Sequence, residues 1–123
     1  MRAFFTILIL FSILLVAMSV NYFYVTELSE ELMKSVEQLP LPDGTEDVSA
    51  QVEQIRQKWL LSRRYVQITV NHAEIELISN AATELYIFAR HMQTAEFERA
   101  RHILISSLEN LKSSEKLSPI NIL

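Results

Sequence analysis

Three histidines, with two acids close to one of them, are the side chains in this sequence best suited to hold a metal ion. His72 is followed by Glu74 and Glu76, and His91 and His102 lie further along the chain. Zinc and similar ions are bound by imidazole and carboxylate groups that converge on one point. On a helix His72 and Glu74 point about 200° apart, and only His72 and Glu76 share a face. The spacing therefore predicts a capping or hydrogen-bonding role for His72 near a helix start, and no metal or other cofactor is predicted.

A basic cluster in the middle of the chain is the second candidate, made of Arg56, Lys58, Arg63 and Arg64. Arg63 and Arg64 are candidates for contact with anionic lipid headgroups or an acidic partner. Residues 27–53 carry eight acids and one base, whereas residues 54–123 carry seven acids and nine bases. Because these two parts attract each other, pairing within the molecule is the preferred interpretation, and an external binding site is the alternative.

No pattern in the chain predicts catalysis. There is no cysteine, which excludes disulfides, thiolate metal sites and a lipid-modified cysteine anchor. A nucleophile paired with a base and a glycine-rich loop are also missing, so we expect a protein that is not an enzyme. The net charge is −4 and no basic face is dense, so no nucleic-acid partner is expected.

The element that must position everything else is an uncharged run of 23 residues from Ala3 to Val25. As a helix it is about 34 Å long, enough to cross the roughly 30 Å hydrocarbon core of a bilayer. Asn21, Tyr22 and Tyr24 resemble the interfacial belt at the end of such a span. We therefore expect residues 1–25 to be a short cytoplasmic N-terminus and a transmembrane anchor in the lipid bilayer.

A cleaved secretory signal is the rival interpretation of this run. Met1-Arg2 is a short positive region, and Ala17-Met18-Ser19 has small residues at a cleavage-site spacing. The apolar run continues past Ser19 to Val25, longer than the usual signal core of about 7 to 15 residues, which favours an uncleaved anchor. Arg2 precedes the span and acids follow it, so residues 26–123 are expected to be an extracytoplasmic domain of a single-pass cell-membrane protein.

Beyond the span, apolar spacings of three and four predict helix almost throughout. The membrane helix is expected to continue outward to Leu39, until the sequence Pro40-Leu41-Pro42-Asp43-Gly44 stops it. Thr45 is predicted to cap a second helix, with Glu46 and Asp47 in its first turn.

The second helix is expected to run to about Val70, with Trp59 in its apolar stripe as a core residue whose indole N–H bonds at the edge. Asn71 is predicted to cap a third helix whose stripe ends at Met92, although helices two and three are alternatively one long bent helix. Thr94 is predicted to cap a fourth helix. Its stripe comprises Phe97, Ala100, Leu104, Leu108 and Leu111.

Four amphipathic segments joined by short connections predict an all-α fold, a single N-terminal transmembrane helix followed by a small antiparallel helical bundle. Two stacked helical hairpins of solenoid type would give the same pattern. The helix pairs share spacing but not residues, so a bundle is preferred.

The chain ends on apolar residues, where termini are usually polar and frayed. Pro119 favours an extended segment lying in a groove between helices. Packing onto the bundle itself is the preferred interpretation, and a docking segment for a partner is the alternative. The candidate contact residues are Leu117, Ile120, Ile122 and Leu123.

Four features together resemble a known family. They are the N-terminal anchor, Trp59, the His72-Ala73-Glu74-Ile75 start of a helix and the closing run from Leu117 to Leu123. They resemble small membrane-anchored proteins from spore-forming Gram-positive bacteria, the domain of unknown function 4363 type. Ala73, where an acid is common, and a Pro-Leu-Pro insert in the first loop depart from that pattern. The resemblance implies an all-helical extracytoplasmic domain and association with other integral membrane proteins of the spore or cell envelope.

The expected function is therefore a non-enzymatic interaction or scaffolding module for envelope or spore membrane proteins. The alternative is an extracytoplasmic helical bundle that senses a ligand, whose small molecule the sequence leaves unknown. Another integral membrane protein is the expected partner, alongside the bilayer.

Overall fold

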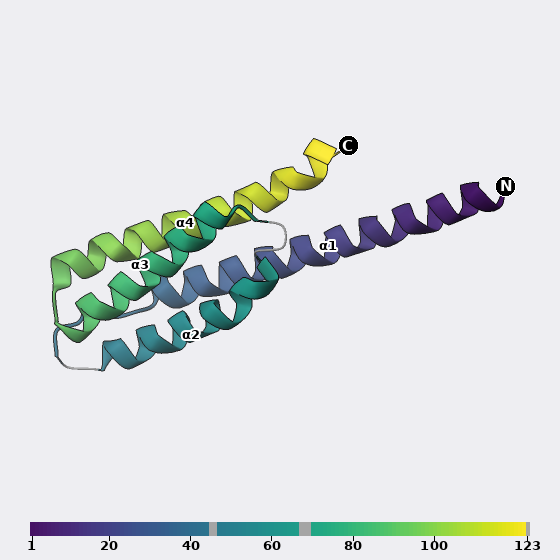
Figure 1. Cartoon of the computed structure of the whole chain (residues 1–123). Helices are drawn as coiled ribbons and strands as arrows, with labels where there is room; N and C mark the ends of the chain where they lie inside the picture. Colours follow the sequence, from purple (N-terminus) through teal and green to yellow (C-terminus); the bar gives the residue numbers. More distant parts are fainter. Residues whose placement is uncertain (45–46, 67–69, 123) are drawn as a thin grey trace.

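The first helix, α1 (Arg2–Glu37), is 36 residues long and has two parts with different surroundings. From Ala3 to Val20 its side chains are exposed, apart from the half-buried Met18, and we call this part the apolar rod. From Val25 onward one face of the same helix is buried. By length and composition α1 is long and apolar enough to cross a membrane. The helix has no break where the rod meets the rest of the fold (Figure 1).

This computed structural model describes the backbone of residues 1–44, 47–66 and 70–122, and side chains as far as Ser113 within those ranges. The described part of the chain contains four α-helices and no strand: α1, α2 (Val48–Val66), α3 (His72–Arg90) and α4 (Thr94–Ile122). Each helix packs against two others, in the cyclic order α1, α2, α3, α4, and the seam between α1 and α2 is the shortest. Neighbouring helices run antiparallel (Figure 1). The all-α prediction is confirmed.

The two ends of this bundle differ. We call the end from which the apolar rod projects the root end; α2 and α4 run toward it, and α3 starts there (Figure 1). The opposite, distal end holds the α1–α2 and α3–α4 connections. There a Cβ added to Gly44 would meet Met92 Sδ at 3.5 Å, so the two connections touch. Gly44 has a φ of 90°, which glycine adopts without strain.

The predicted apolar stripes form the core. Trp59 and Phe97 are its largest fully buried side chains, and the indole Nε1 of Trp59 donates to Ser79 Oγ at 2.8 Å. Each buried side chain of this size contributes about 1.5 to 3 kcal/mol on leaving water, so the core supplies most of the driving force. The stripe predicted on α4 is entirely buried: Phe97, Ala100, Leu104, Leu108 and Leu111.

Asp47 is the N-cap of α2, whereas the sequence predicted it inside the first turn of that helix. Its Oδ1 accepts from the hydroxyl of Ser49 at 2.7 Å and from the backbone N–H of Ala50 at 3.2 Å. These bonds, the Ser49 hydroxyl first, lower the pKa of the Asp47 carboxyl below its ordinary value. Asp47 is a strong N-cap in its own right, so the helix begins at Val48. Thr45 and Glu46 lie outside the described residues.

The boundary at Asn71 is confirmed and the single bent helix is wrong. The Asn71 side chain accepts from the backbone N–H of Ala73 at 2.9 Å, and α3 begins at His72. The second helix ends at Val66, earlier than the predicted Val70. Because α2 and α3 pack against each other along their lengths, the chain reverses direction between them (Figure 1).

Met92 lies outside the core, contrary to the predicted stripe. The third helix ends at Arg90, and Met92 follows it with a φ of 54° and 61% exposure. Its positive φ turns the chain away from the helix axis, so the periodicity no longer applies. The fourth helix starts at Thr94, one residue before the predicted start, and the Phe97 N–H donates to the Gln93 carbonyl at 2.8 Å.

The end of α4 also differs from the prediction. The helix continues through Pro119 to Ile122, where an extended segment was expected. A proline removes one backbone hydrogen bond from a helix, and near a helix end few bonds remain to be disturbed. The side chains of Leu117, Ile120 and Ile122, and all of Leu123, lie outside the described residues.

Candidate functional site

Within the histidine and acid cluster, one polar contact forms on the surface. His72 Nε2 lies 3.2 Å from Glu76 Oε1, and both side chains are exposed. This is the pair that the helical spacing predicts. In the described part of the chain no group of three or more histidine, cysteine or acidic side chains converges as metal ligands would. The pair is a surface contact at the start of α3.

The predicted attraction between the acidic and basic parts takes the form of two ion pairs made by α1. Glu30 Oε1 lies 2.7 Å from Lys112 Nζ on α4, and Glu31 pairs with Lys58 on α2. The hydrogen bond that the Lys112 ammonium donates to Glu30, more than any other cause, raises the pKa of Lys112. The prediction of pairing within the molecule is confirmed for these lysines.

Arg63 and Arg64 differ from the rest of the basic cluster. Arg56 pairs with Glu53 at 3.1 Å and its Nε donates to Thr83 Oγ1 at 3.2 Å. Arg63 and Arg64 are exposed in the last turn of α2, and within the described residues neither makes an ion pair. That turn lies at the root end (Figure 1). The last turn of α2 thus places two cationic residues at the end of the bundle from which the apolar rod projects.

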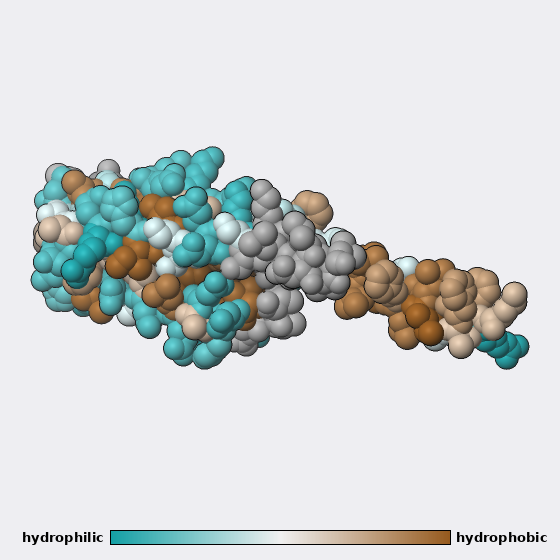
Figure 2. All heavy atoms as spheres, turned by 90° about the horizontal axis from the view of Figure 1, so that it is seen from above, coloured by the Kyte–Doolittle hydropathy of each residue, from teal (hydrophilic) through white to brown (hydrophobic). Residues whose placement is uncertain are grey.

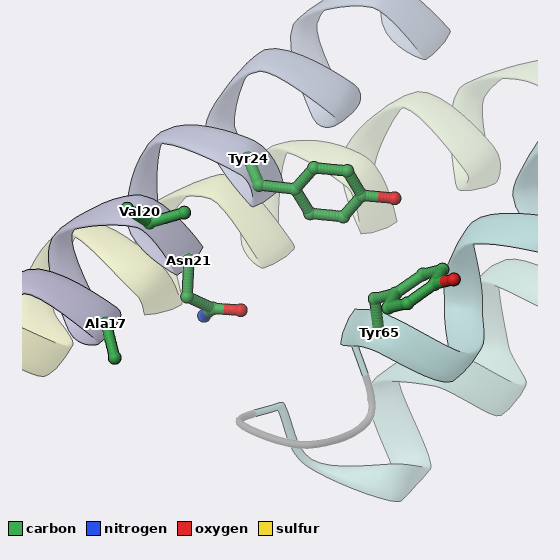
Figure 3. A pocket seen from close by; sticks show the side chains of 5 residues that line it. All are labelled: Ala17, Val20, Asn21, Tyr24 and Tyr65. Atoms are coloured by element: carbon green, nitrogen blue, oxygen red, sulfur yellow. The ribbon is translucent and has the colours of Figure 1, made fainter. Parts of the chain in front are cut away.

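A groove opens at the same place, between the end of the rod and the end of α2. Its volume is about 500 Å³, and we call it the junction groove. The lining residues are Ala17, Val20, Asn21, Tyr24 and Tyr65. Figure 3 shows four of them on α1 and Tyr65 facing them from the last turn of α2. The rings of Tyr24 and Tyr65 meet edge to face with centroids 6.3 Å apart, and they close the groove on the bundle side.

The junction groove exists because α1 and α2 are only loosely packed near the root end. A second, smaller hollow continues the same seam toward the distal end. It is lined by Tyr24, Glu27, Leu28, Glu31, Lys58 and Ser62. The pair of Glu31 with Lys58 bridges the seam at this point. This ion pair therefore bridges the two helices between the smaller hollow and the rest of the seam.

The two parts of the molecule on either side of this level differ in polarity. The surface of the rod is apolar and that of the bundle is predominantly hydrophilic (Figure 2). Within the groove, Ala17 and Val20 are apolar, and the tyrosines carry hydroxyls at the bundle side. Aromatic residues with a polar tip are enriched at the boundary between hydrocarbon and water. Such an arrangement suits a molecule with an apolar tail and a polar head.

The end of α4 reaches the level of the groove. Lys112 pairs with Glu30, and Arg101 Nη1 donates to the Glu37 carbonyl at 3.4 Å, which fixes how α4 lies on α1. The two helices are antiparallel and have the same rise per residue. Counting from these two contacts, the backbone of Ile122 lies level with about Val16 to Val20. The end of α4 carries the candidate contact residues of the tail. Its described backbone therefore lies beside the end of the rod (Figure 1).

Sequence reasoning identified Arg63 and Arg64 but missed Tyr65 and the groove. Tyr24 was identified as interfacial, yet its partner lies 41 positions further along the chain. An exposed aromatic at the end of a helix that returns toward the anchor is the signal that was available. No protein-family model, curated protein or solved structure matches this chain. The family resemblance therefore stays a prediction, and the site rests on its geometry.

Proposed function

We propose that this chain is a non-enzymatic, single-pass membrane protein whose extracytoplasmic helical bundle is an interaction or scaffolding module for other membrane proteins. The observation that carries the proposal is the continuity of α1, which forms the exposed apolar rod and also supplies Val25, Leu28, Leu32 and Val36 to the core. A partner bound to the bundle would be held at a fixed height and orientation on the membrane. The envelope or spore setting is what the family resemblance implies.

The dimensions of the rod support its role as an anchor. Ala3 to Val20 gives about 27 Å of helix, and the interfacial residues that follow extend it beyond the roughly 30 Å of a bilayer core. Arg2 precedes the rod, and Glu27, Glu30 and Glu31 follow it. Basic residues favour the cytoplasmic side, which supports placing the bundle outside.

Two surfaces are offered to the partner. The first is the pair Arg63 and Arg64, which forms no ion pair within the described residues and suits an acidic partner surface. The second is the end of α4 with its apolar residue types from Leu117 onward. Both lie at the root end, where an integral membrane partner comes closest to the bundle (Figure 1).

Co-purification of the affinity-tagged full chain from mild detergent tests the proposal. A matched variant carries a flexible glycine-serine insertion of about ten residues between Val20 and Asn21. This insertion keeps the anchor and the core residues but removes their rigid connection. We expect a stoichiometric membrane partner with the native chain, and loss of that partner with the insertion although the chain still fractionates with membranes.

Two results would contradict the module. A bound small molecule in place of a protein would favour the ligand-sensing bundle. A partner retained equally by the insertion variant would show that rigid positioning by α1 plays no part.

A further inference from the structure

We infer that the junction groove is a binding site for an anionic phospholipid, with an acyl chain against Ala17 and Val20 and the phosphate at Arg63 and Arg64. This inference rests on the anchoring of α1 in the proposed function, and it names a lipid headgroup in place of an acidic protein surface at these two arginines. It assigns a ligand class to the root end and gives Arg63 and Arg64 a shared role.

The groove lies where the apolar rod meets the bundle. Its floor is the end of the apolar rod itself, so a rod in a bilayer places the groove at the boundary between hydrocarbon and headgroups. The groove is not an enclosed cavity, and it lies between α1 and Tyr65 (Figure 3). Ala17 contributes only a methyl group, which leaves room beside the helix.

The lining of the groove changes from apolar to polar along α1. Ala17 and Val20 come first, and Asn21 and Tyr24 follow about one turn further from the rod. Tyr65 adds a second hydroxyl-bearing ring opposite Tyr24. Along the groove an apolar surface is followed by amide and hydroxyl groups. A phospholipid has the same order, with its acyl chain followed by the ester and the headgroup. A water-soluble ligand would find little polar surface in the deeper part.

The end of α2 beside the groove is positively charged. Arg63 and Arg64 belong to the last turn of α2, the turn that also carries Tyr65, and they lie beside the groove without lining it. Both are exposed, and within the described residues neither is neutralised by an acid. Arginine binds phosphate through two parallel N–H bonds, and its long aliphatic stem lets the head reach the interface. Charge complementarity therefore selects an anionic headgroup over a zwitterionic one.

Native mass spectrometry of the full chain, released from mild detergent, tests the site with two probes. These are dioleoyl phosphatidylglycerol, which is anionic, and dioleoyl phosphatidylcholine, which is zwitterionic and has the same chains. A basic residue near an anionic membrane surface is worth about fivefold in binding. We expect the native chain to retain phosphatidylglycerol at least about fivefold more than phosphatidylcholine.

Two variants separate the charge from the groove. Arg63→Gln with Arg64→Gln should bring the two lipids to nearly equal retention, whereas Arg90→Gln with Arg99→Gln, the same charge change at the distal end, should leave the preference intact.

Ala17→Phe fills the groove and should lower retention of both lipids, whereas Ala3→Phe at the far end of the rod should not. Circular dichroism confirms that each variant is folded.

Equal retention of the two lipids by the native chain would overturn the inference. So would a preference that survives loss of both root-end arginines, or unchanged retention with Ala17→Phe; if the arginine variant fails to fold, the Ala17→Phe result decides. Carbonate extraction separates this failure from that of the proposed function. A chain that resists extraction but shows no lipid preference contradicts the lipid site alone, and a chain released by carbonate contradicts the anchor.

Discussion

Lys112 Nζ on α4 lies 2.7 Å from Glu30 Oε1 on α1, and this contact joins the last helix to the first. Both side chains are partly exposed, so the pair sets how the helices lie on each other more than it stabilises them. Its position brings the end of α4 beside the apolar rod.

The pair makes stability depend on pH in the alkaline range. The pKa of Lys112 is raised above its ordinary 10.5, chiefly by the hydrogen bond with Glu30. The folded state therefore holds this proton more tightly than the unfolded state. The contribution is complete below 10.5 and is lost as the pH rises through the raised pKa. Urea unfolding of the native chain and of Lys112→Gln across this range should show a steeper alkaline decline in the native chain. Parallel declines would show that the pair contributes nothing.

Replacing Trp59 should be strongly destabilising. The side chain is 1% exposed, and Trp59→Ala leaves a large cavity between α2 and α3, so the free energy of unfolding should fall by about 3 to 5 kcal/mol. Urea unfolding followed by circular dichroism measures this, because Trp59 is the one tryptophan in the chain. Trp59→Phe keeps most of the volume and loses only the bond to Ser79, so its loss should be smaller. A loss below about 1 kcal/mol for the alanine variant would place Trp59 outside the core.

Removing the Ser29 hydroxyl should stabilise the bundle. Ser29 is fully buried and its Oγ has no hydrogen-bond partner among the described residues, whereas Ser107 Oγ, also buried, donates to the Ile103 carbonyl at 2.7 Å. An unpartnered buried polar group costs about 1 to 3 kcal/mol. Ser29→Ala should therefore raise the free energy of unfolding by about 1 kcal/mol, and the matched Ser107→Ala should not. Destabilisation by both variants would show that Ser29 is hydrogen-bonded in solution.

Local features were predictable and relations between helices were not. The α4 stripe and the Asn71 cap follow from residues close in sequence, and both are confirmed. Met92 and Pro119 were misjudged because a positive φ and a helix end each override a periodic rule. The contact of Tyr24 with Tyr65 depends on how α2 returns to α1, which the spacing within either helix does not contain.

Deleting Leu117 to Leu123 tests what the end of α4 does. Its backbone continues the helix that packs along α1, so the deletion should lower the melting temperature by several degrees for a domain of about 100 residues. Differential scanning calorimetry of the full chain and the deletion in the same detergent measures this. An unchanged melting temperature with loss of a co-purifying protein would assign the segment to a partner. If neither changes, the segment has no role in stability or binding.

We propose that α1 remains in the mature protein as an uncleaved anchor. Intact mass spectrometry of the carbonate-resistant membrane fraction measures it directly. We expect the mass of the chain beginning at Met1 or Arg2, because the apolar rod continues without a break into the core helix. A mass corresponding to a chain that begins at Val20 would show cleavage after Ser19 and would contradict the anchor.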